Sequence, residues 1–167
     1  MRLIYPGSFD PFTRGHLDIV QRALSFGLPL TVVVGHNPEK RSWFTPEERV
    51  ELIRQSVAGA GLDGADRLTV EVHEGLLVAK YAQPGNVLIK GLRGAQDLED
   101  EAVQARFNRE IGNLETLFLP SQASFSHISS SIVKQLAQLE VPLAPYVTKE
   151  VEAALTQKLA ERKEHHD

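Results

Sequence analysis

The sequence predicts a single α/β domain, built on a doubly wound, parallel five-stranded sheet with helices on both faces. Five short apolar segments, typical of buried strands, alternate along the 167 residues with longer segments of helical spacing or helical capping. Strands that are separated by helices pair in parallel, because each crossover returns the chain to the same end of the sheet. We expect one domain over residues 1–167, with a flexible tail from about residue 161.

Composition and charge exclude several classes of protein. Hydrophobic residues make up 42% and charged residues 24% of the chain, as in an ordinary globular domain. The net charge of -4 argues against a nucleic-acid-binding face, and no apolar run approaches the length of a membrane span. The absence of cysteine excludes disulfides and cysteine-ligated zinc. Pro6 comes too early for a signal peptide, so we expect a cytoplasmic protein without nucleic-acid or membrane partners.

The first strand, loop and helix contain the most informative segment. Residues 3–5 are apolar, Pro6 and Gly7 end the strand, and helical spacing begins at Leu17. Gly7 lacks a Cβ, so a ligand can approach its backbone closely. His16 then lies in the first turn of a helix, where free N–H groups and the helix dipole favour a phosphate. A lone histidine at such a place is more often a cap or a packed residue than a catalyst.

The middle of the chain continues the alternation. Residues 30–35 form a continuous β-branched run, typical of a strand buried on both faces. Thr45 and Glu48 can form a capping box, which predicts the start of a structural helix. After a Gly- and Asp-rich loop, residues 68–72 alternate as a strand does. The segment 74–82 then predicts a helix.

The last part of the chain supplies two more strands and three more helices. The strands are expected at residues 86–89 and 116–119. The helix over 97–109 carries acids in its first turns, where the helix dipole favours them. Serines at 129–131 open another helix, and the final helix covers 149–159.

Cations and hydroxyls follow several of these strands. In open α/β sheets, ligands bind beyond the carboxyl ends of the strands. Lys40 follows the second strand, while Lys90 and Arg93 follow the fourth, so the sequence places positive charge where an anion binds. For Lys40, a solvated surface cation is nearly as good an interpretation. The serines at 129–131 combine hydroxyls with the free N–H groups of a helix start, although one of them is explained as an N-cap.

Three strings resemble those of one known family. Residues 7–16, G-S-F-D-P-F-T-R-G-H, resemble the G-x-F-D-P-x-T-x-G-H signature of the T/HxGH nucleotidyltransferases, and look most like the bacterial phosphopantetheine adenylyltransferases. K-G-L-R at 90–93 resembles the family's [R/K]-G-L-R, and I-S-S-S at 128–131 resembles the second signature of the superfamily. The resemblance spans roughly residues 3–159 and implies a Rossmann-like fold.

The resemblance also implies the site residues, and we interpret His16 as the stabiliser of the transition state. The implied ATP-binding residues are Ser8, Phe9, His16, Gly91, Leu92, Arg93, Glu101, Phe125, Ser126, His127, Ile128, Ser129, Ser130 and Ser131. The implied phosphopantetheine-binding residues are Ser8, Lys40, Leu77 and Lys90. No residue is expected to ligate a metal, since the carboxylates that start helix 97–109 are interpreted as a solvated helix start.

The chain departs from the family pattern at a few positions. Lys90 keeps a positive charge but lacks the bidentate fork of arginine. Leu98 and Asp100 stand where Phe and Tyr are usual, which puts an aromatic contact in doubt. The segment around Leu77 is one residue longer than the usual pattern, so the position of the pantetheine-lining residue is open.

The implied reaction transfers the adenylyl group of ATP to 4′-phosphopantetheine, giving 3′-dephospho-coenzyme A and pyrophosphate, the penultimate step of coenzyme A biosynthesis. The acceptor phosphate has a second pKa of about 6 and is mostly dianionic at neutral pH, so no general base is required. The enzyme then acts by positioning and charge stabilisation in a reversible, in-line transfer. The resemblance further implies Mg2+, a homohexamer, and coenzyme A as a candidate feedback inhibitor.

Two other functions are weighed against this one. A nicotinate or nicotinamide mononucleotide adenylyltransferase shares the histidine loop, but the F-D-P-x-T and K-G-L-R strings argue against it. A non-catalytic nucleotide-binding regulator of the same fold is the second alternative. The presence of His16, Lys40, Arg93 and the three serines argues against a degenerate site.

Overall fold

The computed structural model describes residues 1–164 of the chain. The last three residues of the expected tail, 165–167, lie outside the described residues. No helix in the described range is both long and apolar enough to cross a membrane.

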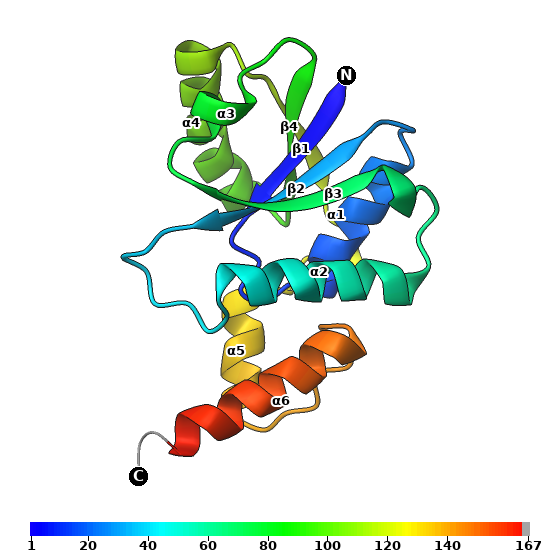
Figure 1. Ribbon diagram of the computed structural model, residues 1–167, viewed down its shortest axis with the longest axis vertical. Coiled ribbons are helices and arrows are strands. Elements are labelled where there is room, and N and C mark those ends of the chain that lie inside the picture. The colour runs from blue at the N-terminus through cyan, green and yellow to red at the C-terminus, as the bar shows by residue number, and fades with distance from the viewer. Residues whose placement is uncertain (165–167) are drawn as a thin grey trace.

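Five parallel strands form one sheet in the order β3-β2-β1-β4-β5 (Figure 1). The strands are β1 Arg2–Gly7, β2 Leu30–His36, β3 Leu68–Glu74, β4 Asn86–Leu92 and β5 Thr116–Pro120. The chain first winds outward from β1 to β3 and then crosses back to β4 and β5 on the other side of β1. The expected doubly wound parallel sheet is therefore confirmed, and its order reverses between β1 and β4, where open α/β sheets bind ligands.

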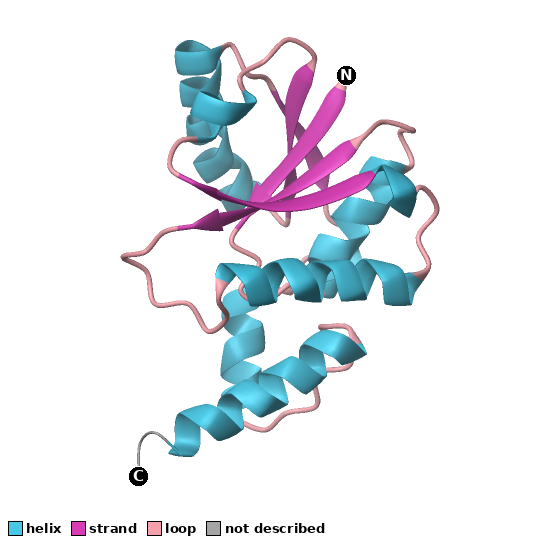
Figure 2. Ribbon diagram, viewed as in Figure 1, coloured by secondary structure: helices cyan, strands magenta, loops and turns pink. Residues whose placement is uncertain are grey.

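Helices cover both faces of this sheet (Figure 2). They are α1 Arg14–Leu24, α2 Pro46–Ala60, α3 Leu77–Tyr81, α4 Ala95–Gly112, α5 Ser130–Gln138 and α6 Lys149–Glu164. Alternate residues of β1 face opposite layers: Leu3 and Tyr5 join the larger core with α1 and α2, whereas Ile4 joins a smaller core that includes Tyr81 of α3. Helices α5 and α6 lie beyond α2, away from the sheet (Figure 1).

Capping residues explain where two of the helices begin. The Thr45 hydroxyl accepts from the Glu48 N–H at 3.2 Å, and the Glu48 carboxylate accepts from the Thr45 N–H at 2.7 Å, so the predicted capping box of α2 is confirmed. Thr13 caps α1 in the same way, with His16 as the reciprocal partner. The cap thus places His16 in the first turn of α1.

The structure corrects three expected boundaries. Glu74 ends β3 and α3 begins only at Leu77, because Gly75 adopts a φ of 86° that glycine allows and that separates the two elements. Strand β4 continues to Leu92, so Lys90 and Gly91 lie within the strand rather than after it. Helix α6 continues to Glu164, beyond the expected end of the last helix at residue 159.

Candidate active site

A cleft of about 470 Å3 opens at the carboxyl ends of β1 and β4. Its wall comes from the end of β1, the loop before α1, the end of β4, the first turns of α4 and the start of α5. The sequence-predicted residues in this wall are Ser8, Phe9, His16, Lys90, Gly91, Arg93, Glu101, Phe125, Ile128, Ser129 and Ser130. The fold therefore brings three separate strings of the sequence together at the switch point of the sheet.

His16 presents a neutral imidazole to the cleft. Its Nδ1 accepts a hydrogen bond from the Thr13 N–H at 3.1 Å, so the neutral ring carries its proton on Nε2. The ring also packs against Phe9 and Phe12, with centroids 5.0 and 5.6 Å away. Burial, and then the charge of Arg93, lower the pKa of His16 to about 4. At neutral pH, His16 is therefore a fixed hydrogen-bond donor through Nε2.

The loop between β1 and α1 is shaped by packing within the protein. A Cβ on Gly7 would lie 2.7 Å from the Phe9 ring, so this glycine admits the ring of Phe9. This packing explains the glycine; Gly7 also lines the cleft, and the close approach of a ligand to its backbone stays a prediction. The buried Arg49 of α2 donates to the Ser8 carbonyl at 2.7 Å and to the Gly35 carbonyl at 3.1 Å, which holds the loop against β2.

The two predicted cations, Lys90 within β4 and Arg93 just after it, each pair with a carboxylate. The Arg93 guanidinium donates to both oxygens of Asp97 at 2.8 and 2.9 Å. This hydrogen bonding raises the pKa of Arg93 and lowers the pKa of Asp97. The Lys90 ammonium lies 3.0 Å from Glu101, which sequence analysis had assigned to the other substrate. The carboxylates at the start of α4 are thus partly paired with cleft cations, rather than simply solvated.

The start of α5 presents its N-terminus to the cleft, through Ser129 and Ser130. The Ser129 hydroxyl accepts from the Ile132 N–H at 3.2 Å and acts as the N-cap. The Ser130 hydroxyl donates to the Pro11 carbonyl at 2.8 Å and ties α5 to the loop of β1. Ser131 is exposed and lies outside the cleft wall. Two of the three serines therefore have structural partners, while the free N–H groups of the helix remain available to an anion.

Other predicted residues lie apart from this wall. Leu92 belongs to β4, and Leu77 packs against the smaller core on the face of α3. Lys40 is exposed on the loop between β2 and α2. Ser126, His127 and Ser131 are near the start of α5 but do not line the described cleft.

Sequence reasoning missed several residues that form or support the cleft. Tyr5 lines it, and burial together with Glu101 raises the pKa of its phenol. Asp97 could have been found from its spacing, four residues after Arg93 on a helix start. Asp10 and Lys134 form an ion pair at 3.0 Å across 124 positions of sequence, which no local pattern reveals.

Comparisons with known proteins show the family to which the chain belongs. The model of the cytidylyltransferase-like family matches residues 4–136. A phosphopantetheine adenylyltransferase of Thermotoga neapolitana is 44% identical over 165 residues, covering 98% of this chain and 99% of the relative. A phosphopantetheine adenylyltransferase of Deinococcus radiodurans is 40% identical and covers 96% of this chain and 95% of the relative.

Solved structures share the fold at much lower identity. A bifunctional NMN adenylyltransferase/ADP ribose pyrophosphatase from Francisella tularensis matches with a TM-score of 0.71 and 15% identity, over 93% of this chain and 48% of that one. The nicotinic acid mononucleotide adenylyltransferase of Plasmodium falciparum matches with a TM-score of 0.60 and 14% identity, over 96% and 95% of the two chains. These two likenesses show the fold alone. The sequence matches go further, and the chain belongs to the phosphopantetheine adenylyltransferases of the cytidylyltransferase-like family.

Proposed function

We propose that the protein transfers the adenylyl group of ATP to 4′-phosphopantetheine, forming 3′-dephospho-coenzyme A and pyrophosphate. Phosphopantetheine adenylyltransferases that are 40–44% identical over nearly the whole chain support this reaction. The observation that carries it is the neutral His16 in a cleft lined by the N-termini of α1 and α5 and by the cations Lys90 and Arg93. Such a cleft suits a polyphosphate whose charge increases at one phosphorus during reaction.

The proposed chemistry is an in-line displacement without a protein base. A phosphate oxygen of the acceptor, already deprotonated at neutral pH, attacks the α-phosphorus of ATP. The bond from the α-phosphorus to the bridging oxygen breaks, and pyrophosphate leaves with the bonding electrons. The Nε2–H of His16 donates to the α-phosphate oxygen on which charge develops. Because one phosphoanhydride bond forms as another breaks, the step runs in either direction.

ATP is proposed to lie between α1, the end of β4 and the start of α5. The N–H groups at the start of α5 receive the β and γ phosphates, and Arg93 adds positive charge. Contacts with the rest of the nucleotide are proposed for Ser8, Phe9, Gly91, Leu92, Glu101, Phe125, Ser126, His127, Ile128 and Ser131. The position of most of these residues in or beside the cleft supports this assignment.

The acceptor is proposed to approach from the side of Lys40 and Lys90. Lys90 lies in the cleft wall, and Lys40 stands on the exposed loop that leaves β2. Ser8 is close to both substrates in this arrangement. The side chain of Leu77 packs against the smaller core, so its contact with the acceptor rests on the sequence resemblance.

Mg2+ is proposed to arrive with ATP rather than to occupy a resident site. In the described part of the chain, no three acidic, histidine or cysteine side chains come together as a metal site. Mg2+ usually keeps several waters and takes its remaining ligands from substrate phosphates and one or two carboxylates. The chain's cleft fits that mode of binding, and the chemistry above assigns no step to the ion.

We further propose that the protein is a homohexamer in the cytoplasm. The structure describes all 18 residues of α4, and none of them is buried. Its large apolar side chains are instead exposed: Leu98, Val103, Phe107 and Ile111. A contact between copies of the chain would cover this face. Coenzyme A shares the pantetheine arm and adenylate of the product, so we expect it to compete for the same cleft.

Pyrophosphate release tests the proposed function directly. Wild-type protein is given ATP and Mg2+ with either 4′-phosphopantetheine or nicotinate mononucleotide. We expect pyrophosphate release with 4′-phosphopantetheine as acceptor and none with nicotinate mononucleotide, and we expect mass spectrometry to identify dephospho-coenzyme A as the product. Release only with the mononucleotide would assign the protein to the alternative activity, and ATP binding without release would indicate a regulator.

A further inference from the structure

The carboxylate of Asp10 links its own loop, which lines the cleft, to the loop between β2 and α2 and to helix α5. Its side chain is 8% exposed. One oxygen accepts from the Phe44 N–H at 2.9 Å, and the Trp43 N–H reaches the two oxygens at 3.0 and 3.1 Å. Lys134 of α5 donates to the carboxylate at 3.0 Å. Asp10 itself follows Phe9, which lines the cleft.

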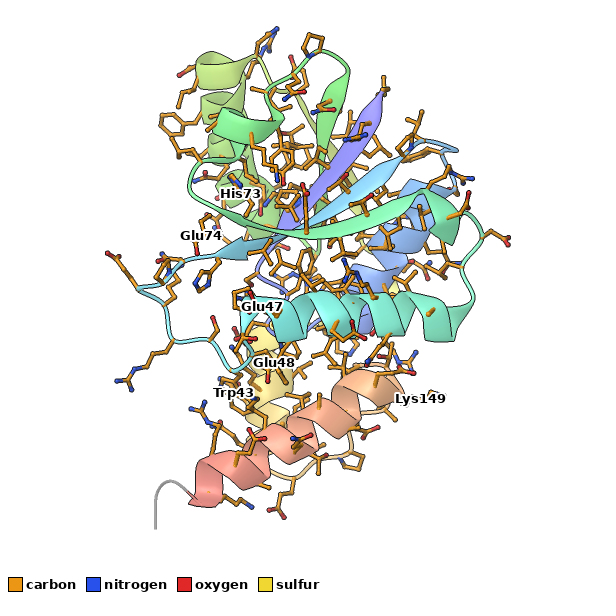
Figure 3. All side chains as sticks on the ribbon, viewed as in Figure 1. Trp43, Glu47, Glu48, His73, Glu74 and Lys149 are labelled. Atoms are coloured by element: carbon orange, nitrogen blue, oxygen red, sulfur yellow. The ribbon has the colours of Figure 1, made fainter. Side chains whose placement is uncertain are left out.

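The first of these links holds the loop between β2 and α2. Trp43 and Phe44 form the end of that loop, just before the N-cap of α2, and Lys40 lies three residues earlier. Arg162 of α6 lies over the Trp43 ring at 4.9 Å, and Figure 3 shows Trp43 near the starting end of α2. The main chain at the base of the Lys40 loop is therefore anchored to Asp10.

The second link holds the start of α5. Ser130 and Lys134 are one helical turn apart and lie on the same face of α5. Ser130 donates to the carbonyl of Pro11, and Lys134 pairs with the neighbouring Asp10. Helix α5, whose N-terminus faces the cleft, is thus attached to two consecutive residues of the loop between β1 and α1.

The loss of hydration offsets most of the stability that the ion pair between Asp10 and Lys134 could contribute. Lys134 is 23% exposed and Asp10 8%, so both charges lose much of their water, and such a pair is often no more stabilising than apolar residues of similar size. Its geometry serves a different purpose, because one carboxylate can bind two backbone N–H groups and an ammonium at the same time. The bonds lead to two segments, the end of the loop between β2 and α2 and helix α5.

We propose that Asp10 and Lys134 are positioning residues that hold the Lys40 loop and the start of α5 in register with His16. The inference rests on the proposed function, in which these two segments bind the acceptor and the ATP phosphates. Neither residue touches a substrate in this proposal. A displacement of about 1 Å between reacting groups can lower the rate about 100-fold, so a small loosening of the pair has a large effect on turnover.

Lys134→Met tests the proposal, with Lys134→Arg as the conservative variant. We expect Lys134→Met to lower kcat about 10- to 100-fold while the calorimetric Kd of ATP changes less than about threefold. Lys134→Arg retains the charge and is expected to restore most of the rate. Lys163→Met is the matched control, because it breaks an exposed lysine–carboxylate pair of 2.9 Å far from the cleft and should leave kcat unchanged.

A spectroscopic readout keeps the test independent of turnover. Trp43 is the single tryptophan of the chain, so its quenching by acrylamide reports on the base of the Lys40 loop. We expect Lys134→Met to raise the quenching constant at temperatures where the protein is fully folded, although its Tm falls because the buried Asp10 carboxylate loses its partner. Asp10→Asn, which keeps one carbonyl acceptor for the backbone N–H groups, should act in the same direction if Lys134→Met does not fold.

The outcomes separate the inference from the proposed function. Normal kcat and normal quenching in Lys134→Met would overturn the positioning role. A loss of rate that follows a fall in Tm, and that Lys134→Arg does not rescue, would also overturn it. If wild type shows no transfer to 4′-phosphopantetheine, the proposed function fails, whereas the quenching comparison still decides whether the pair holds the loop.

Discussion

Arg93 and Asp97 form a bidentate ion pair at the start of α4, with guanidinium nitrogens 2.8 and 2.9 Å from the two carboxylate oxygens. The Arg93 N–H also donates to the same carboxylate at 2.9 Å. The pair therefore fixes both the backbone and the side chain of a cation in the cleft wall. Its side chains are 42% and 24% exposed, so its effect on stability is small and its effect on orientation matters more.

Asp97→Asn should weaken ATP binding more than it weakens the fold. Without the carboxylate, Arg93 loses its fixed orientation, and we expect the Kd of ATP to rise up to about tenfold with a change in stability below about 1 kcal/mol. Calorimetric titration and thermal unfolding measure the two effects. Glu115→Gln, which breaks the exposed pair with Arg109, is the control. Unchanged or tighter ATP binding in Asp97→Asn would contradict an orienting role.

His16 should remain neutral far below the usual histidine range. The unfolded chain binds a proton at this residue as the pH falls through about 6.5, whereas the folded chain binds it only near a pKa of about 4. The folded state is therefore destabilised as the pH falls from about 6.5 to 4, and this contribution is constant above that window. Proton NMR of the His16 ring, assigned with His16→Gln, measures the midpoint. A midpoint near 6.5 would contradict the lowered pKa and the neutral imidazole.

Gly91→Ala should destabilise the protein through Ile19 of α1. A Cβ at position 91 would lie 2.9 Å from Ile19 Cγ1, and Ile19 is almost fully buried. We expect a loss of about 1–3 kcal/mol in the free energy of unfolding, measured with urea. Gly94→Ala is the control, because nothing lies within 4 Å of its added Cβ. Equal effects of the two substitutions would mean that the contact with Ile19 is not the reason why position 91 is a glycine.

Phe107→Glu should dissociate the proposed oligomer without unfolding the chain. Phe107 is 53% exposed on the apolar face of α4, where a charge would be buried in a contact between copies. Sedimentation velocity should show the wild type as an oligomer and the variant as a smaller species. Leu139→Glu, a charge at a more exposed leucine outside α4, should leave the assembly intact. A monomeric wild type would contradict the assembly.

Local patterns were enough to predict much of the fold. The β-branched run of β2 and the capping box at Thr45 are visible in the sequence, and both are confirmed. The two interpretations of His16 are also compatible, because the residue completes the cap of α1 through Nδ1 and lines the cleft. The alternation of strands and helices then predicts parallel pairing.

Long-range contacts account for what the sequence could not reveal. Gly7 and Gly91 are explained by the packing of Phe9 and Ile19, which depends on how α1 and its loop lie on the sheet. The partner of Lys134 is 124 positions away in the sequence. Lys90 meets Glu101 only because β4 and α4 lie side by side, so the sequence could assign them to different substrates.

Turnover by His16→Ala beside wild type tests the central claim most directly. ATP, Mg2+ and 4′-phosphopantetheine are supplied at saturation, and the Kd of ATP is measured on the same samples. If the Nε2–H of His16 stabilises charge on the α-phosphate, kcat should fall about 100- to 1,000-fold while the Kd changes little. A kcat within about twofold of wild type would remove His16 from the chemistry and contradict the account of the cleft.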